Sequence, residues 1–316
     1  MRIEPDIASP GILIDAWLPS DEAFVEAAGW WLAEASRLLA GPLWGQMVTS
    51  APMVRLGSDG FPCGVPGGVA ATLSVLPQPP WNRGEDSVMI RPYSPANIEW
   101  MLGELVQRPL STEFELVGLD ADGEPHETTS ETLLVRVMVL EDTQEWVQFT
   151  AGIVSPLPGG DLRQPAASSR WAEVCQTMAR RVDVSFGHVC DDDSGRGQTP
   201  LDEVLFRGGR ILSITKGRDV LRGYSWVTVV PAGLAQKLGG AEAMRASGAF
   251  AVVDELPSGG LWLQATSHFA DYDPAAVHRV FRALAPVLPT GRPKPKPDPF
   301  DEKSRRLIWD DAANWR

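Results

Sequence analysis

Histidine, cysteine and aspartate come closest together at His188, Cys190 and the three aspartates of residues 191–193. A zinc site needs three or four converging ligands, usually with two of them paired as Cys-x-x-Cys or His-x-x-x-His. Calcium loops alternate their acids and close with a glutamate, a pattern that this segment lacks. Because three consecutive aspartates are also typical of a solvated turn, we predict no metal site and no cofactor. An enzyme with an unrecognised site near His188 and Cys190 stays open as an alternative.

The glycine-rich segments do not form a recognised catalytic or phosphate-binding motif. Residues 64–68 contain a proline and lack the Lys-Ser/Thr pair of a phosphate-binding loop. Gly239 and Gly240 follow an expected helix, so a helix C-cap explains them better. The Gly-x-Ser-x-Gly sequence of a nucleophile elbow is missing. We therefore assign no catalytic residue.

Carboxylates crowd two expected loops between strands. Acid–base catalysis needs two carboxylates in different environments within a cleft, and loop carboxylates in water do not provide that. A repeated acidic rim at one end of a sheet would instead meet a basic protein surface. The predicted partner-binding residues are Asp120, Asp122, Glu124, Glu127, Glu141, Asp142 and Glu145.

The acidic charge is concentrated in one half of the sequence. The chain has a net charge of −13, and residues 1–158 hold 22 acids and 7 bases, whereas residues 159–316 hold 19 acids and 21 bases. A net acidic protein is a poor match for a phosphate backbone, which excludes nucleic acid as the expected partner. A one-sided acidic field attracts basic partners, although the same acids would also keep a protein in solution.

The remaining composition predicts a cytoplasmic globular protein that does not enter the membrane. Hydrophobic residues make up 44% and charged residues 22% of the 316-residue chain, as in ordinary globular proteins. Apolar runs stay shorter than the roughly 20 residues that span a bilayer. The acidic N-terminus is unlike a secretory signal. Cys63, Cys175 and Cys190 are too scattered for a disulfide framework, and we expect reduced thiols.

Hydrophobic spacing and turn residues predict an α+β fold with mainly antiparallel sheets and amphipathic helices on one face. A helix is expected over residues 20–39, where a serine cap precedes two acids. The order strand, helix, strand, strand, helix then occurs twice, from about residue 88 with an extra strand, and from about residue 222. This order is typical of split βαβ, ferredoxin-like units.

We expect four segments along the chain. Residues 1–86 form an N-terminal helix and Gly/Pro-rich strands that pack on the first unit, which covers residues 87–200. The second unit covers residues 201–288. Residues 289–316 begin with alternating prolines and charges, which favour an extended segment, and end in an apolar tail expected to dock on the protein body.

The second unit resembles a known family at the residue level. Its motifs are Gly223-Tyr224-Ser225-Trp226-Val227-Thr228, then Gly233-Leu234, then Leu238-Gly239-Gly240. They resemble the signature of bacterial toxin-immunity proteins of the type VI secretion immunity family, in which a Gly-x-x-Trp-Leu-Thr strand leads into a helix ending in Leu-Gly-Gly. The sequence departs from that signature at Val227 and in its Pro-rich tail. The eight signature positions, which the resemblance marks as structural, are Gly223, Trp226, Thr228, Gly233, Leu234, Leu238, Gly239 and Gly240.

The resemblance implies a non-catalytic cytoplasmic immunity protein that neutralises a cognate protein toxin by binding it. A basic surface on that toxin would match the acidic first half of the chain. A structural or accessory subunit of a secretion or phage-like assembly is an alternative hypothesis, suggested by the 12 tryptophans. The oligomeric state is left open.

Overall fold

The computed structural model describes residues 10–57, 60–79, 88–125, 132–153, 160–191, 199–205, 210–294 and 306–316. It confirms the predicted α+β class, with antiparallel sheets and helices. The chain packs as two compact units, unit 1 from Met1–Trp17 and Pro158–Arg316 and unit 2 from Leu18–Leu157. These boundaries differ from the expected ones at residues 86, 200 and 288, because the N-terminal strand joins the second half of the chain.

Unit 2 begins with helices and continues as a sheet. Its helical segments are α1 (Asp21–Trp30), η1 (Trp31–Ala35), α2 (Ser36–Ala40), α3 (Pro42–Ser50), η2 (Ala51–Met53), α4 (Pro95–Glu104) and η3 (Leu105–Gln107). Its strands are β2 (Arg55–Leu56), β3 (Pro62–Cys63), β4 (Val69–Leu76), β5 (Met89–Pro92), β6 (Ser111–Gly118), β7 (Thr132–Val139) and β8 (Trp146–Ile153). The helix expected over residues 20–39 is present as α1, a π-helical turn and α2, and it ends at Gly41, whose φ is +55°.

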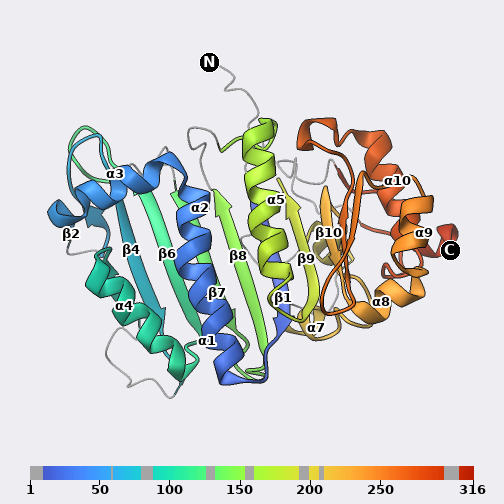
Figure 1. Ribbon diagram of the computed structural model, residues 1–316, viewed down its shortest axis with the longest axis horizontal. Coiled ribbons are helices and arrows are strands. Elements are labelled where there is room, and N and C mark those ends of the chain that lie inside the picture. The colour runs from blue at the N-terminus through green and yellow to red at the C-terminus, as the bar shows by residue number, and fades with distance from the viewer. Residues whose placement is uncertain are drawn as a thin grey trace. The chain divides into compact units, whose positions relative to one another are not determined.

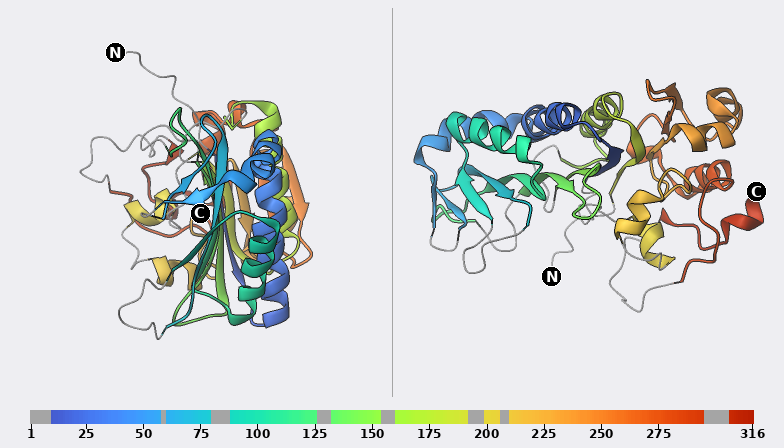
Figure 2. Two further views of the ribbon diagram at one scale, coloured as in Figure 1. Left: turned by 90° about the vertical axis from the view of Figure 1, so that its left-hand side faces the viewer. Right: turned by 90° about the horizontal axis from the view of Figure 1, so that it is seen from below.

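The sheet of unit 2 has the order β8-β7-β6-β4-β5 with every neighbour antiparallel, while β2 and β3 pair separately. Since β5 and β6 are both antiparallel to β4, they run parallel on either side of it. The connection β5-α4-β6 is therefore a split βαβ unit, as expected. Figure 1 shows α1, α2 and α4 in front of the strands and running roughly along them, and the right panel of Figure 2 shows these helices on one side of the sheet.

The strand register separates the core face of unit 2 from a more exposed face. Phe114 pairs with Val135, which pairs with Ala151, and all three side chains are buried on the face that the helices cover. Trp31 packs there against Phe149, with ring centroids 5.9 Å apart. Its indole N–H donates to the Arg136 and Thr150 carbonyls at 3.1 and 3.3 Å, so the tryptophan is satisfied in the core.

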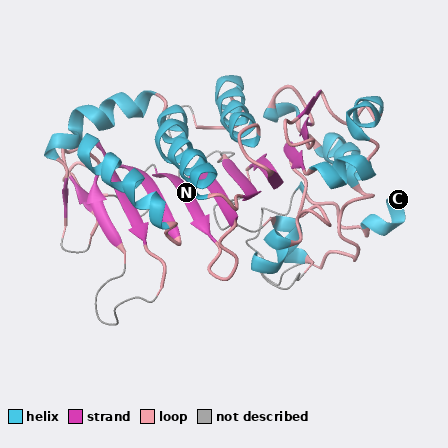
Figure 3. Ribbon diagram, turned by 60° about the horizontal axis from the view of Figure 1, so that its bottom comes forward, coloured by secondary structure: helices cyan, strands magenta, loops and turns pink. Residues whose placement is uncertain are grey.

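Among its described residues, unit 1 contains five strands, each antiparallel to its neighbours within the unit. Its strands are β1 (Gly11–Trp17), β9 (Val184–Cys190), β10 (Val227–Val230), β11 (Val252–Glu255) and β12 (Leu261–Gln264), in the order β11-β12-β10-β9-β1. Its helical segments are α5 (Pro165–Ala179), α6 (Pro200–Val204), α7 (Arg210–Thr215), α8 (Ala232–Lys237), α9 (Gly240–Ala246), η5 (Phe269–Asp271), α10 (Pro274–Leu284) and η7 (Ala312–Trp315). Figure 3 distinguishes the helices from the strands of each unit.

The second strand–helix–strand–strand–helix order is also present, as β10, α8 with α9, β11, β12 and α10. Strand β12 is antiparallel to both β10 and β11, so it lies between two parallel strands in another split βαβ arrangement. The first expected copy, β5 to β9, has the expected element order but is divided between units, because α5 and β9 belong to unit 1.

The C-terminal tail packs against the rest of unit 1. The N–H of Ile308 donates to the Tyr224 hydroxyl at 2.7 Å, and the Trp315 ring lies 6.3 Å from that of Phe281. Most of the proline-and-charge segment falls in residues 295–305, outside the described ranges. Among the helices within the described ranges, none has both the length and the apolar character needed to cross a membrane.

Candidate partner-binding surface

His188 and Cys190 lie on the inner strand β9 and are both about 1% exposed. The Cys190 Sγ and His188 Nε2 atoms are 3.5 Å apart. Burial, assisted by the Arg222 charge, lowers the pKa of His188 to about 3, so the imidazole is neutral at physiological pH. Asp191 pairs with Arg306 at 3.2 Å, and residues 192–193 lie outside the described ranges. Within those ranges no group of three potential metal ligands converges, and none of the three cysteines forms a disulfide.

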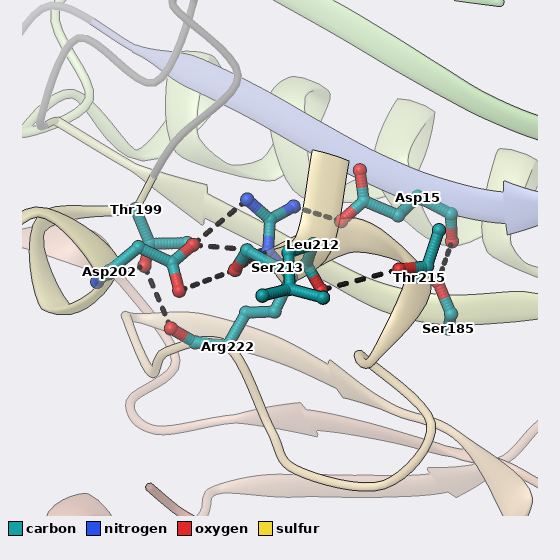
Figure 4. Close-up of polar contacts among 8 residues, drawn as sticks. All are labelled: Asp15, Ser185, Thr199, Asp202, Leu212, Ser213, Thr215 and Arg222. Atoms are coloured by element: carbon teal, nitrogen blue, oxygen red, sulfur yellow. Dashed lines mark hydrogen bonds and ion pairs between the residues drawn. The ribbon is translucent and has the colours of Figure 1, made fainter. Parts of the chain in front are cut away.

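A buried cluster of charges lies in unit 1 (Figure 4). The Arg222 guanidinium is fully buried between Asp15 of β1 and Asp202 of α6. It donates to the Asp15 carboxylate, to Asp202 Oδ2 at 2.9 Å and to the Ser213 hydroxyl at 2.9 Å. Burial alone lowers the pKa of Arg222, but the two carboxylates outweigh it and raise that pKa overall. With its charges paired and sealed from solvent, the cluster holds β1, α6 and α7 together.

Sequence reasoning missed this cluster, although one signal was present. Asp15 is a single charge inside the apolar segment Gly-Ile-Leu-Ile-Asp-Ala, and a buried charge requires a partner. The identity of that partner could not be read, because Arg222 is 207 residues away in the chain.

The family-signature residues shape the interior of unit 1. Trp226 is 1% exposed and donates to the Thr266 carbonyl at 3.0 Å, while the Thr228 hydroxyl accepts from the Ser225 N–H at 3.0 Å. Gly239 has φ of +83°, and a Cβ there would lie 2.8 Å from that of Ala243. Leu234 and Leu238 are buried. Gly223 lies against Thr199, Gly240 has φ of +77°, and Gly233 lies in α8. These residues therefore pack in the core of unit 1 or form its turns.

The two predicted acidic loops lie at opposite ends of the unit 2 sheet. Strands β6, β7 and β8 follow one another as antiparallel neighbours, so successive connections must leave from opposite ends. With about 3.3 Å per residue, the eight-residue strand β7 separates the loops by roughly 25 Å. The expectation of one acidic rim is therefore wrong.

The connection from β6 to β7 uses one of its acids internally. The Asp120 Oδ1 atom accepts the N–H groups of Asp122 and Glu124 at 2.8 and 3.0 Å, and so fixes the turn. Asp122 and Glu124 are exposed, whereas Glu127 lies outside the described residues. At this loop, two of the predicted contact residues are available to a partner.

The turn from β7 to β8 joins the N-terminus of α1. Glu141, Asp142 and Glu145 are exposed, and the Glu145 carbonyl accepts the N–H of Leu18 at 2.7 Å. Asp21 and Glu22, in the first turn of α1, are also exposed. We call these five acids the turn surface; sequence reasoning identified three of them.

The buried Arg108 side chain connects the segments that carry the turn surface. Its guanidinium donates to Asp21 at 2.7 Å and to the carbonyls of Gln144, Leu18 and Ser20 at 2.7, 2.6 and 3.0 Å. The side chain is 8% exposed, and the backbone has φ of +46°, unusual for a residue other than glycine. One arginine therefore ties the β7–β8 turn to the start of α1.

The whole net charge of the protein belongs to unit 2. Residues 18–157 hold 19 acids and six arginines, a net charge of −13, whereas the rest of the chain holds 22 acids and 22 bases. Arg37 pairs with Glu34 at 2.8 Å, Arg136 with Glu113 at 2.7 Å, and Arg108 with Asp21. These pairs use arginines within the unit and leave the acids of its loops in excess.

The geometry defines an α+β protein with antiparallel strands in both units and an acidic second unit. No protein-family model matches the chain, and no curated protein sequence does. Among solved structures, the Pseudomonas aeruginosa T6SS protein PA0821 is similar, with a TM-score of 0.51 and 13% identity, covering 97% of this chain and 84% of the other. At this identity the likeness concerns the fold.

Proposed function

We propose that this protein is a non-catalytic, cytoplasmic binding protein of the type VI secretion system that neutralises a cognate toxin. The observation that carries the proposal is the segregation of charge, with −13 on unit 2 and zero on unit 1. The residue-level resemblance of unit 1 to immunity proteins and the fold likeness to a T6SS protein point to the same system.

The expected partner is a protein with a basic surface. An acidic field raises the rate at which a basic partner arrives, and added salt reduces this effect. Exposed charges at the edge of an interface mainly change the association rate, while buried contacts mainly change the dissociation rate. The exposed acids of unit 2 are therefore expected to control the association rate.

A structural or accessory subunit of the secretion assembly is the second candidate. The fold likeness favours it equally, because the name of the similar protein specifies its secretion system and no activity. Protection of cells against the toxin distinguishes the two candidate functions. An immunity protein protects cells that express the toxin, whereas an accessory subunit forms a complex without giving protection.

The decisive experiment is co-expression with the product of the adjacent gene. We expect a stable complex and rescue of growth from toxicity. A complex without rescue would favour the accessory subunit, and neither a complex nor rescue would overturn the proposal.

Association kinetics of the purified complex test the role of charge. Replacing Asp122, Glu124 and Glu127 together by Asn, Gln and Gln should slow association and flatten its salt dependence. The same change at Glu141, Asp142 and Glu145 tests the turn surface. The loops lie at opposite ends of the sheet, so the set with the larger effect identifies the end that the partner approaches.

A further inference from the structure

Unit 2 exposes an apolar patch at the edge of its sheet. Phe61, Val88, Met89 and Ile90 are 58, 40, 36 and 42% exposed, and we call these four residues the β5 patch. The loop of Phe61 and strand β5 are neighbours, because a Cβ on Gly60 would lie 3.7 Å from Ile90 Cδ1. Scattered exposed apolar side chains are normal, whereas three in succession on an outer strand indicate an interaction site.

The backbone of β5 can accept another strand. Among the described residues β5 pairs only with β4, in the register Val75–Met89, Ser74–Ile90 and Leu73–Arg91. The N–H of Tyr93 donates to the Ala71 carbonyl at 2.8 Å, and hydrogen-bonded pairs alternate along an antiparallel ladder. Met89 and Arg91 therefore direct their backbone groups to β4, and Ile90 directs its N–H and C=O outward.

The outer strands of both units are partly covered, and in β5 the Pro92 carbonyl accepts from the Asn97 side chain at 2.9 Å. Because proline has no N–H, Ile90 is the residue of β5 left with both backbone groups directed outward. In β11 the carbonyl of Val253 accepts a hydrogen bond from Arg245 at 3.0 Å, and Asp254 accepts one from Gln176 at 2.9 Å. Charged residues and covered carbonyls are the usual means of blocking an edge strand. The charged side chain of β5, Arg91, is instead stacked on Trp100 with its guanidinium carbon 3.9 Å from the ring centre.

Charge selects the kind of strand that β5 would accept. A second copy of this chain would bring two units of net charge −13 edge to edge, which is repulsive. A segment with alternating apolar and basic side chains would bury the β5 patch and match the net negative charge of unit 2. Adding such a strand supplies backbone hydrogen bonds for affinity and side-chain contacts for specificity.

We propose that the outer edge of β5 and the β5 patch bind an extended segment of a partner protein in which apolar and basic residues alternate. This inference rests on the proposed function for the identity of the partner, but the docking site can be tested without it.

The test uses the full chain and a fluorescent peptide of about ten residues that alternates valine and lysine, with binding followed by anisotropy. Ile90→Asp and Phe61→Asp alter the patch. Val106→Asp, at a position that is 62% exposed outside the patch, adds the same charge as a matched control. Circular dichroism verifies that each variant is folded.

Charge alone and strand docking predict opposite results. An added carboxylate should tighten a purely electrostatic complex, whereas docking on the patch predicts binding about tenfold weaker for Ile90→Asp and Phe61→Asp. We expect that loss, with Val106→Asp unchanged or slightly tighter and with a proline-interrupted peptide failing to bind. Equal binding by the three variants, or by the proline-interrupted peptide, would overturn the inference.

Two further outcomes separate this inference from the proposed function. A complex with the toxin that survives both patch substitutions unchanged overturns the docking site and leaves the proposed function intact. Sedimentation that shows a wild-type dimer and a monomeric Ile90→Asp variant overturns the assignment of the occupant, because a second copy would then cover β5.

Discussion

Replacing Arg108 by Met should destabilise unit 2 more than any exposed ion pair of the unit can. The guanidinium makes three hydrogen bonds to backbone carbonyls and one to Asp21, and methionine keeps much of the apolar stem. At about 1 kcal/mol for each carbonyl bond, these three contribute roughly 3 kcal/mol. The Asp21 side chain is 77% exposed, so its ion pair adds only about 0.5 kcal/mol.

The assay is urea denaturation followed by circular dichroism, with hydrogen exchange at the start of α1 as a local readout. Arg37→Met is the matched control, because Arg37 and Glu34 form an ion pair with both side chains 49% exposed. We expect a loss of about 3 kcal/mol in the free energy of unfolding for Arg108→Met and under about 0.5 kcal/mol for the control.

If Arg108→Met lowers the free energy of unfolding by no more than the control does, the reasoning is refuted. Arg108→Gly gives a second check, since glycine removes the cost of the positive φ, about 1 kcal/mol, while it still loses the hydrogen bonds. That variant should be less stable than wild type, and a gain in stability would show that backbone strain outweighs the contacts.

Three further predictions concern unit 1. Arg222→Met should lower the free energy of unfolding by about 3–5 kcal/mol in chemical denaturation, because it removes the cation buried between the Asp15 and Asp202 carboxylates, and full stability of the variant would contradict this. His188 binds protons in the unfolded state below its ordinary pKa near 6.5 but in the folded state only near 3, so stability falls as pH drops through this window. His188→Gln should remove a slope of up to about 1.4 kcal/mol per pH unit there, and an unchanged acid profile would argue against a buried neutral imidazole. Burial raises the pKa of Tyr224, and the hydrogen bond from the Ile308 N–H lowers it by less. Deleting residues 306–316 removes both the cover of the tail and that bond, so it should lower the pKa in an ultraviolet titration, and a pKa equal to or above that of wild type would show that burial by the tail is not the larger effect.

Local features of the fold could be predicted from the sequence because their causes lie within a few residues. Ser20 and Ser94 cap α1 and α4, as expected from a serine before the first helical turn. Gly239 ends its helix with a positive φ, as a C-cap requires. The element order of both split βαβ units followed from the same short-range periodicity, and the excess of acids in the first half could be counted directly.

Which elements and residues meet was decided by the tertiary structure. Strand β1 was not expected. It pairs with β9, where Gly11 lies opposite Cys190, a residue that is far away in the sequence. Asp15 carried a signal that a partner must exist, but its meeting with Arg222 depends on how β1, α6 and α7 pack. The acidic loops were recognised, yet their separation follows from the antiparallel order of β6, β7 and β8. Capping and turn formation depend on neighbours in sequence, whereas strand pairing and buried charge pairing depend on contacts that only the folded chain brings together.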